Sequence, residues 1–334
     1  MKIESRKEGL FKLGDTLNSF IKEPDFDFLE KIRQSNQWFI PEFILRSIDG
    51  IRGLLNTQNI EKWLSDYTIP DKKIRKVGII MAGNIPLVGF HDLLSVIISG
   101  HHAVIKTSHL DSILTKWVVE KLYAINPEFK TIISFTDRIK YIDALIATGS
   151  DNSARYFQYN FKALPAIIRK NRSSIAILNG NEDEGVINSI ADDIFLYFGL
   201  GCRNVSKLFV PEDFNNDSIS SSLKRFEFLQ KHKGYKNNYN QQKAINSISD
   251  GSFHDGGFYL MKKSTGFISP VSVIYYEDYE NRGQLENKIR SIADKIQCII
   301  STDYPNSISP GEAQYPELWD YADNVDTMTF LTTL

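Results

Sequence analysis

The sequence predicts an α/β protein in which parallel strands alternate with helices. From residue 76 onward, short apolar runs such as 76–82, 102–106 and 144–148 alternate with amphipathic segments of helical length. Strands separated by helices pair in parallel through right-handed crossovers, so helices cover both faces of the sheet. A chain of 334 residues is long for one core, so we expect two domains.

The composition is typical of a globular protein in a reducing compartment. Apolar residues make up 42% of the chain and charged residues 24%. The net charge of −2 gives no reason to expect nucleic acid or an anionic membrane as a partner. No apolar stretch reaches a membrane span, and the N-terminus lacks the core of a signal peptide. Only Cys202 and Cys298 are cysteines, which favours a cytoplasmic location, and no His/Cys cluster has metal-ligand spacing.

The first 70 residues predict a helical segment that packs on the main body. Leucines recur there at helical spacing, at Leu10, Leu13 and Leu17. Pro70-Asp71 ends this pattern.

The remainder divides into a first α/β domain at residues 71–200, a second at 201–312 and a tail at 313–334. We place the division at the glycines just before Cys202. The tail is irregular and ends in an apolar, strand-like stretch, 327–334, that could pair between subunits of a homo-oligomer.

Individual elements follow from the same periodicities. Further strands are predicted at 131–135, 165–168, 174–178, 207–210, 257–261, 271–276 and 297–301. Helices are predicted at 87–99, 112–124, 139–143, 150–161, 184–198, 217–231 and 284–295. The polar stretch 234–242 has weak periodicity and receives no assignment.

Cys202 is the first candidate for chemistry. It follows the glycine-bearing stretch Gly199-Leu200-Gly201 and precedes the apolar run 207–210. A thiol at such a junction can be exposed at the end of a sheet and still be held rigidly, which suits a nucleophilic thiolate. The alternative is a small buried hydrophobe, as most single cysteines are.

Asn84 is the second candidate, in the stretch Met81-Ala82-Gly83-Asn84-Ile85-Pro86-Leu87. A strand ends there and a helix begins, so the carboxamide would project from the carboxyl end of the strand. A neutral donor at that place suits a developing oxyanion. The alternative is an asparagine that caps the helix, with Pro86 in its first turn.

Two further strand ends carry groups that suit an anionic ligand. Lys106 closes the strand 102–106, where its charge could meet a phosphate or ribose of a dinucleotide or simply extend into water. Gly149 and Ser150 follow the strand 144–148 and precede a helix, and N–H groups at a helix start can hold a pyrophosphate. Neither GxGxxG nor a P-loop is present.

These segments, in this order, resemble the aldehyde dehydrogenase superfamily, and more closely its acyl-CoA reductase branch, to which the fatty acid reductases of bacterial bioluminescence belong. The similarity covers roughly residues 75–300 and rests on Gly83-Asn84-Ile85-Pro86-Leu87, Lys106-Thr107-Ser108, Gly149-Ser150, Cys202 with the strand after it, and the block 266–278. The resemblance implies a parallel, Rossmann-like cofactor sheet at 71–200 and a smaller α/β catalytic domain at 201–312.

The resemblance also implies roles for individual residues. Cys202 would be the nucleophile and Asn84 the oxyanion donor. The cofactor would be held by residues at the three strand ends, namely Ala82, Gly83, Lys106, Ser108, Gly149 and Ser150. NADPH is favoured over NADH by the resemblance and by Lys106.

Two departures from the superfamily bear on the reaction. The hydrolytic members carry a glutamate that activates water, and the corresponding stretch here, 168–174, has no carboxylate. This suits an acyl-enzyme that exchanges with a thiol. Gly266 stands where a second glutamate helps to hold the nicotinamide ribose, and threonine replaces proline at Thr107.

The resemblance therefore implies reduction of an acyl-CoA, and of a fatty acyl-CoA in particular, to the aldehyde through an S-acyl-cysteine. An acyl-phosphate reductase of a small metabolite and a non-catalytic relative that binds acyl or nucleotide ligands are the alternatives. A cysteine hydrolase is disfavoured because no histidine lies near Cys202 in the sequence.

Overall fold

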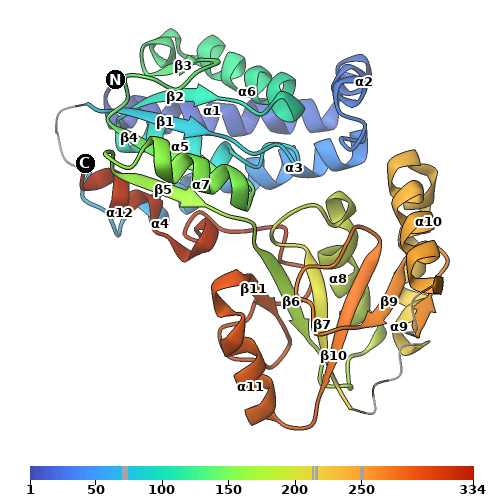
Figure 1. The fold of residues 1–334 in the computed structure, drawn as a ribbon. Coiled ribbons are helices and arrows are strands. Elements are labelled where there is room, and N and C mark those ends of the chain that lie inside the picture. Colours follow the sequence, from blue (N-terminus) through green and yellow to red (C-terminus); the bar gives the residue numbers. More distant parts are fainter. Residues whose placement is uncertain (70–73, 213, 215–216, 249–251) are drawn as a thin grey trace. The chain divides into compact units, whose positions relative to one another are not determined.

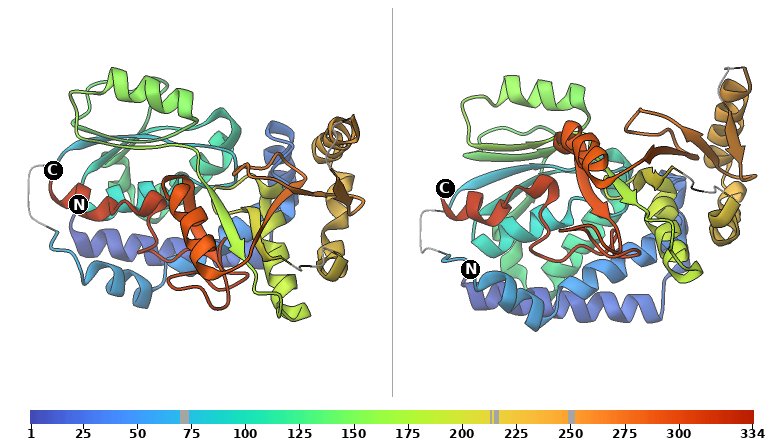
Figure 2. Two further views of the ribbon diagram at one scale, coloured as in Figure 1. Left: turned by 60° about the horizontal axis from the view of Figure 1, so that its bottom comes forward. Right: turned by 90° about the horizontal axis from the view of Figure 1, so that it is seen from below.

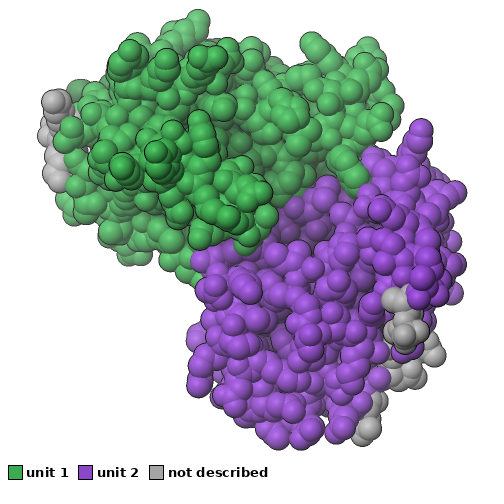
Figure 3. Space-filling view, in the orientation of Figure 1, with its two compact units in different colours: residues 1–171, 317–334 green, residues 172–316 purple. Residues whose placement is uncertain are grey.

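The computed structural model describes residues 1–69, 74–212, 214, 217–248 and 252–334, and Figures 1 and 2 show its ribbon. The expected break at Pro70-Asp71 lies outside the described residues. The chain forms two compact units (Figure 3). Unit 1 comprises Met1–Asn171 and Glu317–Leu334, and unit 2 comprises Arg172–Pro316. The chain therefore leaves unit 1 after Asn171 and returns to it at Glu317.

Unit 1 begins with four helices, α1 (Ile3–Lys22), α2 (Phe26–Ser35), α3 (Pro41–Leu54) and α4 (Thr57–Leu64). Leu10, Leu13 and Leu17 of α1 are fully buried in the core of unit 1, which confirms the face predicted from their spacing. Asp25 and Asn56 accept hydrogen bonds from the first turns of α2 and α4 and so fix where these helices begin.

Sheet A of unit 1 is fully parallel. Its strands are β1 (Lys76–Ile80), β2 (His102–Lys106), β3 (Ile133–Phe135), β4 (Ala144–Thr148) and β5 (Ala166–Arg169). They lie in the order β3-β2-β1-β4-β5, with β1 pairing β2 on one side and β4 on the other. The direction of the strand order reverses at β1 and β4, and ligands of open α/β sheets bind at the carboxyl ends of the strands beside such a switch point.

Helices cover both faces of sheet A, as predicted. They are α5 (Phe90–Ser99), α6 (Ser112–Ile125) and α7 (Asp151–Asn160). Figure 2 shows α7 and α1 on opposite sides of the sheet. α5 is buried almost all round, and apolar side chains make up most of its sequence. Among the described residues, no helix combines the length and apolar character that a bilayer crossing would require.

Two helix predictions in unit 1 need correction. Residues 139–143 are not helical. Ile139 and Ile142 instead pack on β1, where a Cβ built on Gly78 would lie 2.8 Å from Cδ1 of Ile142, so the sheet takes up their apolar side chains without a helix. The helix predicted from residue 87 begins only at Phe90, after a turn.

The C-terminal stretch 327–334 forms a helix over its first six residues, so the predicted strand is wrong. α12 spans Thr327–Thr332 and packs on α5. Asp326 caps it by accepting from the backbone N–H of Thr329 at 2.8 Å. Met328 and Leu331 are buried in the core of unit 1, so this apolar pattern reflects packing within unit 1.

Unit 2 is built on sheet B, whose strands are β6 (Ser173–Ile177), β7 (Val205–Pro211), β8 (Phe253–Asp255), β9 (Leu260–Lys263), β10 (Val273–Tyr279) and β11 (Ile296–Ile300). They lie in the order β11-β6-β7-β10-β9-β8. All described pairs are parallel except β8 with β9. β6, which corresponds to the strand predicted at 174–178, pairs with β7 in this second sheet.

The helices of unit 2 are α8 (Glu184–Phe195), α9 (Asp217–Leu223), α10 (Lys233–Ile248) and α11 (Arg282–Ser291). α10 includes the polar stretch 234–242 that received no assignment. Its buried tyrosines, Tyr235 and Tyr239, are four residues apart and lie on one helical face. A stripe so narrow gives a weak periodicity in the sequence.

Candidate active site

The residues predicted to hold a cofactor gather along one edge of sheet A. Ala82, Gly83 and Asn84 follow β1, Lys106 ends β2 with Ser108 beyond it, and Gly149 and Ser150 follow β4. Because β1 pairs in parallel with both β2 and β4, these strand ends are neighbours in unit 1. The backbone N–H of Met81 also donates to the carbonyl of Lys106 at 3.0 Å, which continues the pairing past β1.

The turns after β1 and β2 touch at Gly83. A Cβ built on this glycine would lie 2.6 Å from both Cβ and Oγ of Ser108, which is closer than such atoms approach in proteins. The absence of a side chain at Gly83 is therefore what allows the two turns to meet. Ser108 itself accepts a hydrogen bond from the N–H of Leu110 at 3.3 Å.

Asn84 is exposed in the turn that leads to α5. It does not cap that helix, because the N-cap position is Gly89, so the alternative interpretation of Asn84 is wrong. Leu87 in the same turn has a φ of 57°, a left-handed conformation that costs about 1–3 kcal/mol for a residue other than glycine.

A buried carboxyl supports this strained turn. Asp111 is 4% exposed, and its Oδ2 accepts from the N–H of Leu87 at 2.8 Å and from Oγ1 of Thr115 at 3.3 Å. Oδ1 is buried and has no hydrogen-bond partner among the described residues. Burial raises the pKa of Asp111 to about 7. Asp111 was not predicted from the sequence, because its position at the start of α6 indicates only a helix cap.

The side chains at the other two strand ends are open to solvent. Lys106 is exposed, and within the described part of the chain no carboxylate forms an ion pair with it. Ser150 is exposed at the N-cap of α7, where its Oγ accepts from the N–H of Ser153 at 3.3 Å. The N–H of Gly149 donates to the carbonyl of Arg169 at 3.3 Å, which ties this turn to β5.

This donor set fits an anionic nucleotide. An exposed ammonium, hydroxyls and the start of a helix line the edge of a parallel sheet beside its switch point, which is where open α/β sheets bind dinucleotides. Among the described residues, no three His, Cys, Asp or Glu side chains gather as ligands for a metal ion.

Cys202 lies in unit 2, in the turn that precedes β7. It is half-buried, so the structure does not place it in sealed apolar packing. Its carbonyl accepts from the hydroxyl of Ser174 on β6 at 3.1 Å. The turn is therefore anchored to the neighbouring strand while Cys202 stays partly exposed.

The loop before Cys202 has an unusual backbone. We call residues 196–201 the approach loop. Tyr197, Phe198 and Gly199 follow one another in the left-handed region, with φ values of 54°, 59° and 73°. Both aromatic side chains are buried. Such strain persists only where the surrounding structure enforces it, and it concentrates at functional sites.

Cys298 on β11 is the second thiol near this turn. Its Sγ lies 3.0 Å from Oγ of Ser174, the same hydroxyl that binds the carbonyl of Cys202. Burial, with a contribution from the charge of Cys202, raises the pKa of Cys298 to about 11. Cys298 is therefore a neutral thiol near pH 7, and both cysteines are free. Both residues are half-buried, and of the two only Cys202 lies in a turn at the start of a strand, whereas Cys298 lies within β11.

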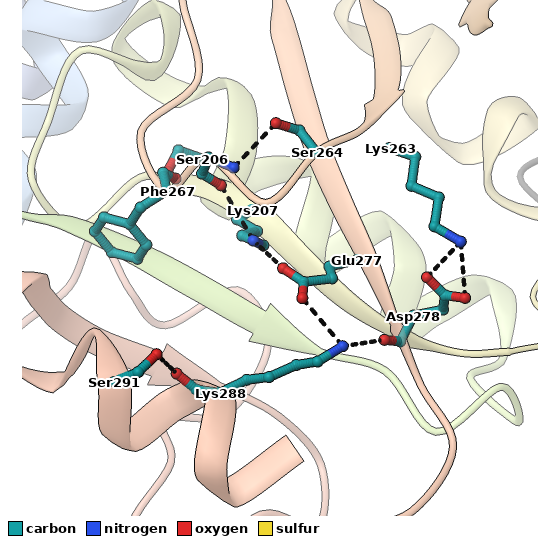
Figure 4. A network of polar contacts seen from close by, with 10 residues as sticks. Ser206, Lys207, Lys263, Ser264, Phe267, Glu277, Asp278, Lys288 and Ser291 are labelled. Atoms are coloured by element: carbon teal, nitrogen blue, oxygen red, sulfur yellow. Dashed lines mark hydrogen bonds and ion pairs between the residues drawn. The ribbon is translucent and has the colours of Figure 1, made fainter. Parts of the chain in front are cut away.

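A buried cation holds the segment that carries Gly266 (Figure 4). Lys207 on β7 forms an ion pair with Glu277 on β10, and its Nζ donates to the carbonyl of Gly266 at 3.1 Å. Glu277 also pairs with Lys288 on α11 at 3.0 Å. The hydroxyl of Ser206 donates to the carbonyl of Phe267 at 3.0 Å, so residues 206 and 207 together fix this segment.

The carboxylate-free stretch 168–174 contains another buried cation. Arg169 donates to Oδ2 of Asp92 on α5 at 2.7 Å and to Oγ1 of Thr327 at 2.9 Å. This pair of buried charges was not predicted from the sequence. The available signal was Asp92 itself, the one acidic residue in a helix that is mostly apolar, because acidic residues are rarely buried without a partner.

The structure thus assembles the candidate residues in two groups. The cofactor candidates and Asn84 share one edge of sheet A in unit 1, and Cys202 stands at the start of β7 in unit 2. The convergence of Cys202 and Asn84 on one reacting carbon stays a prediction.

Searches with protein-family models and against curated proteins found no match. Solved structures match at low sequence identity. An aldehyde dehydrogenase of Bacillus cereus in complex with NAD+ is 13% identical with a TM-score of 0.63, over 90% of this chain and 72% of that chain. An aldehyde dehydrogenase of Mycobacterium tuberculosis complexed with NAD+ is 14% identical with a TM-score of 0.63, over 94% and 76%.

A betaine aldehyde dehydrogenase of Staphylococcus aureus in complex with NAD+ is similar to the same degree, with 13% identity and a TM-score of 0.64 over 94% of this chain and 72% of that one. At such identities the likeness concerns the fold. The α/β class and the aldehyde-dehydrogenase-like architecture predicted from the sequence are confirmed. The chain has the aldehyde dehydrogenase fold.

Proposed function

We propose that the protein reduces an acyl-CoA, and a fatty acyl-CoA in particular, to the aldehyde with NADPH, through an S-acyl intermediate on Cys202. The observation that carries this proposal is the turn around Cys202, which is anchored to β6, preceded by strained backbone and only half-buried at Cys202. The aldehyde dehydrogenase fold supports it, because the structural neighbours are oxidoreductases that bind a nicotinamide dinucleotide.

The thiolate of Cys202 attacks the thioester carbonyl, the bond from that carbon to the sulfur of CoA breaks, and CoA leaves as a thiolate that takes up a proton. An acyl group then remains on Cys202. A reduced nicotinamide held by the residues at the edge of sheet A would supply the hydride that reduces this acyl group. The resulting thiohemiacetal collapses, which releases the aldehyde and restores the Cys202 thiolate.

The carboxamide of Asn84 and the backbone N–H of Cys202 would stabilise the oxyanion. Donors fixed in advance at the place where negative charge develops lower the barrier most. The hydrogen bond that fixes the turn of Asn84 suits this role, because Asp111 accepts it from the backbone N–H of Leu87 in the same turn.

The edge of sheet A would hold the cofactor. Gly149 and Ser150 suit the pyrophosphate at the start of α7, and Ala82 and Gly83 leave room for the backbone to approach it. Lys106 ends the second strand of the sheet, near where such folds recognise the adenosine ribose, and a cation there favours the 2′-phosphate of NADPH over NADH. Ser108, in contact with Gly83, completes this edge.

The stretch 168–174 supports exchange of the acyl group with a thiol rather than with water. It has no carboxylate to activate water, and its buried arginine, Arg169, is bound to Asp92. We therefore expect acyl-Cys202 to hydrolyse slowly in the absence of NADPH and CoA.

Intact-mass spectrometry of the purified protein after addition of an acyl-CoA tests the proposal. We expect one acyl adduct in the wild type and in Cys298→Ala, and none in Cys202→Ala. Addition of NADPH should discharge the adduct with release of aldehyde. An adduct that persists in Cys202→Ala contradicts the assigned nucleophile.

The electrophile is tested in parallel by following NADPH oxidation with acyl-CoAs of several chain lengths and with an acyl phosphate. Faster turnover of the acyl phosphate would show that the substrate is an acyl phosphate rather than an acyl-CoA. No adduct and no turnover with either would favour a non-catalytic binding protein.

Replacement of Asn84 by alanine should lower turnover by about two to three decades, because one oxyanion donor contributes about 3–4 kcal/mol. Alkylation of Cys202 by iodoacetamide, which forms no oxyanion, should proceed at the wild-type rate and serves as the control. Unchanged turnover in Asn84→Ala would remove Asn84 from the mechanism.

A further inference from the structure

A buried asparagine joins the two ends of the approach loop. Asn204, two residues beyond Cys202, is 2% exposed. Its Oδ1 accepts from the backbone N–H of Gly201 at 2.7 Å, and its Nδ2 donates to the carbonyl of Leu196 at 2.9 Å. One side chain therefore closes residues 196–201 into a loop whose ends are fixed to a common point.

The same side-chain amide caps the C-terminus of helix α8. Nδ2 of Asn204 also lies 3.0 Å from the carbonyl oxygen of Asp193 and 3.4 Å from that of Ile194, both in the last turn of α8. The last carbonyls of a helix have no partner within the helix, so a donor from elsewhere is needed to satisfy them. The backbone carbonyl of Asn204 in turn accepts from the N–H of Ser174 on β6 at 3.1 Å.

Asn204 is thus bonded to α8, to the approach loop and to β6. The loop that it closes contains Tyr197 and Phe198 in the left-handed region. Strained backbone relaxes unless its surroundings hold it in place, and the hydrogen bonds of Asn204 lie at both ends of the strained stretch.

We propose that Asn204 is the positioning residue for Cys202, holding the approach loop so that the thiol and the backbone N–H of Cys202 face the same carbonyl carbon. The inference rests on the proposed function for what Cys202 attacks. Asn204 itself contacts neither substrate nor cofactor in this role. A displacement of about 1 Å at a reacting group can cost about 100-fold in rate, so loss of these bonds should act on the chemical step.

Two substitutions and one matched control test the proposal. Asn204→Ala removes every side-chain bond, whereas Asn204→Asp keeps an acceptor for the N–H of Gly201 and loses the amide donors. Asn246→Ala is the control. Asn246 is 5% exposed in unit 2, donates to the carbonyl of Gln242 at 2.8 Å and accepts from Lys262 at 2.7 Å, on α10 rather than at the turn of Cys202.

The measurement compares two rate constants at Cys202 in the same preparation. Acylation by acyl-CoA needs an aligned thiol and oxyanion donor, whereas alkylation by iodoacetamide needs only access and a thiolate. We expect acylation to fall roughly 100-fold in Asn204→Ala and roughly 10-fold or more in Asn204→Asp. Alkylation should stay within about threefold of wild type, and both rates should be unchanged in Asn246→Ala.

Acylation within threefold of wild type in both Asn204 variants would overturn the proposal. Equal losses in acylation and alkylation would do so too, since they indicate a general structural defect. Rates are normalised to folded protein by circular dichroism, and Asn204→Asp decides the outcome if Asn204→Ala does not fold.

Hydrogen exchange separates this inference from the proposed function. The amide of Gly201 should exchange faster in Asn204→Ala than in wild type and Asn246→Ala, with no substrate needed. If wild-type protein forms no acyl adduct, the proposed function fails while this exchange still reports on the loop. Unchanged exchange of Gly201 in Asn204→Ala would show that the side chain does not hold the loop.

Discussion

Asp111 is a carboxyl group whose acid–base behaviour is set by its surroundings. It is buried beneath the turn of Asn84, with one oxygen bound to the N–H of Leu87 and the other without a described partner. Burial raises its pKa from 3.8 in the unfolded chain to about 7 in the fold. The folded protein therefore binds more protons than the unfolded chain between these two values.

This difference in proton binding makes the free energy of unfolding fall as the pH rises. The contribution of Asp111 to the free energy of unfolding is largest below pH 4, falls by a few kcal/mol as the pH rises to about 7, and then stays constant. Asp111→Asn keeps an acceptor for Leu87 and cannot ionise, so we expect its stability profile to lack this decline. Urea denaturation of both proteins from pH 4 to 8 measures the difference.

Asp193 in unit 2 does not affect the difference in stability between wild type and Asp111→Asn. Burial raises its pKa to about 7 as well, while its carboxylate accepts from the N–H groups of Gly311 and Ala313. It is present in both proteins, so its contribution cancels in the difference. Parallel pH profiles for wild type and Asp111→Asn would contradict the assignment of a raised pKa to Asp111.

At the scale of elements, the pair of Asp92 and Arg169 joins α5 to β5, and Thr327 adds the start of α12. Arg169→Met should leave Asp92 buried without its partner and lower the free energy of unfolding by about 3–5 kcal/mol. The double variant Asp92→Leu with Arg169→Met should recover much of this loss, because no buried charge remains.

Thermal and urea unfolding check this prediction. The pair of Arg33 and Glu30, exposed on α2, is the control, and Arg33→Met should change stability little because water screens such pairs. A loss in Arg169→Met as small as that in Arg33→Met would show that Asp92 finds water or another partner.

Buried elements were the most predictable from the sequence. β2 and β4 have the bounds that their apolar runs predicted. β4 is buried at its first four residues, and a strand covered on both faces reads as a continuous apolar run. The predicted strand at 327–334 failed because its apolar residues meet α5, which suits a helix equally well. Short apolar runs do not distinguish a strand from a buried helix until their packing partner is known.

The candidate site was predictable where chemistry and strand ends coincide. Asn84, Lys106 and Ser150 lie at the edge of sheet A that the strand pattern indicated. Asp111 and Asn204 were missed, because a single polar residue next to a turn looks the same in a sequence whether it caps a helix or lies buried with several partners. The left-handed conformations of Tyr197 and Phe198 have no sequence signal, since that region usually belongs to glycine.

For the whole molecule, the candidate residues divide between the two units, and substitutions in each should affect different steps. Lys106→Ala in unit 1 should weaken NADPH binding about tenfold, as expected for one charge-assisted hydrogen bond. NADH binding should change little, because NADH lacks the 2′-phosphate. The rate of Cys202 alkylation in unit 2 should stay the same.

Cofactor titration by fluorescence and alkylation followed by mass spectrometry measure the two effects. Lys12→Ala is the matched control, since Lys12 is an exposed lysine of unit 1 on α1 that pairs with Glu8 at 2.7 Å. Equal losses for NADH and NADPH in Lys106→Ala would rule out recognition of the 2′-phosphate by this residue.

The return of the chain to unit 1 at Glu317 affects the order in which the protein can form on the ribosome. Tyr321 receives a hydrogen bond from the indole of Trp63 at 2.6 Å, and Leu331 enters the core around α5. A nascent chain that has emerged only to residue 316 holds all of unit 2 but lacks these groups. The core of unit 1 can therefore be completed only after the whole of unit 2 has been translated.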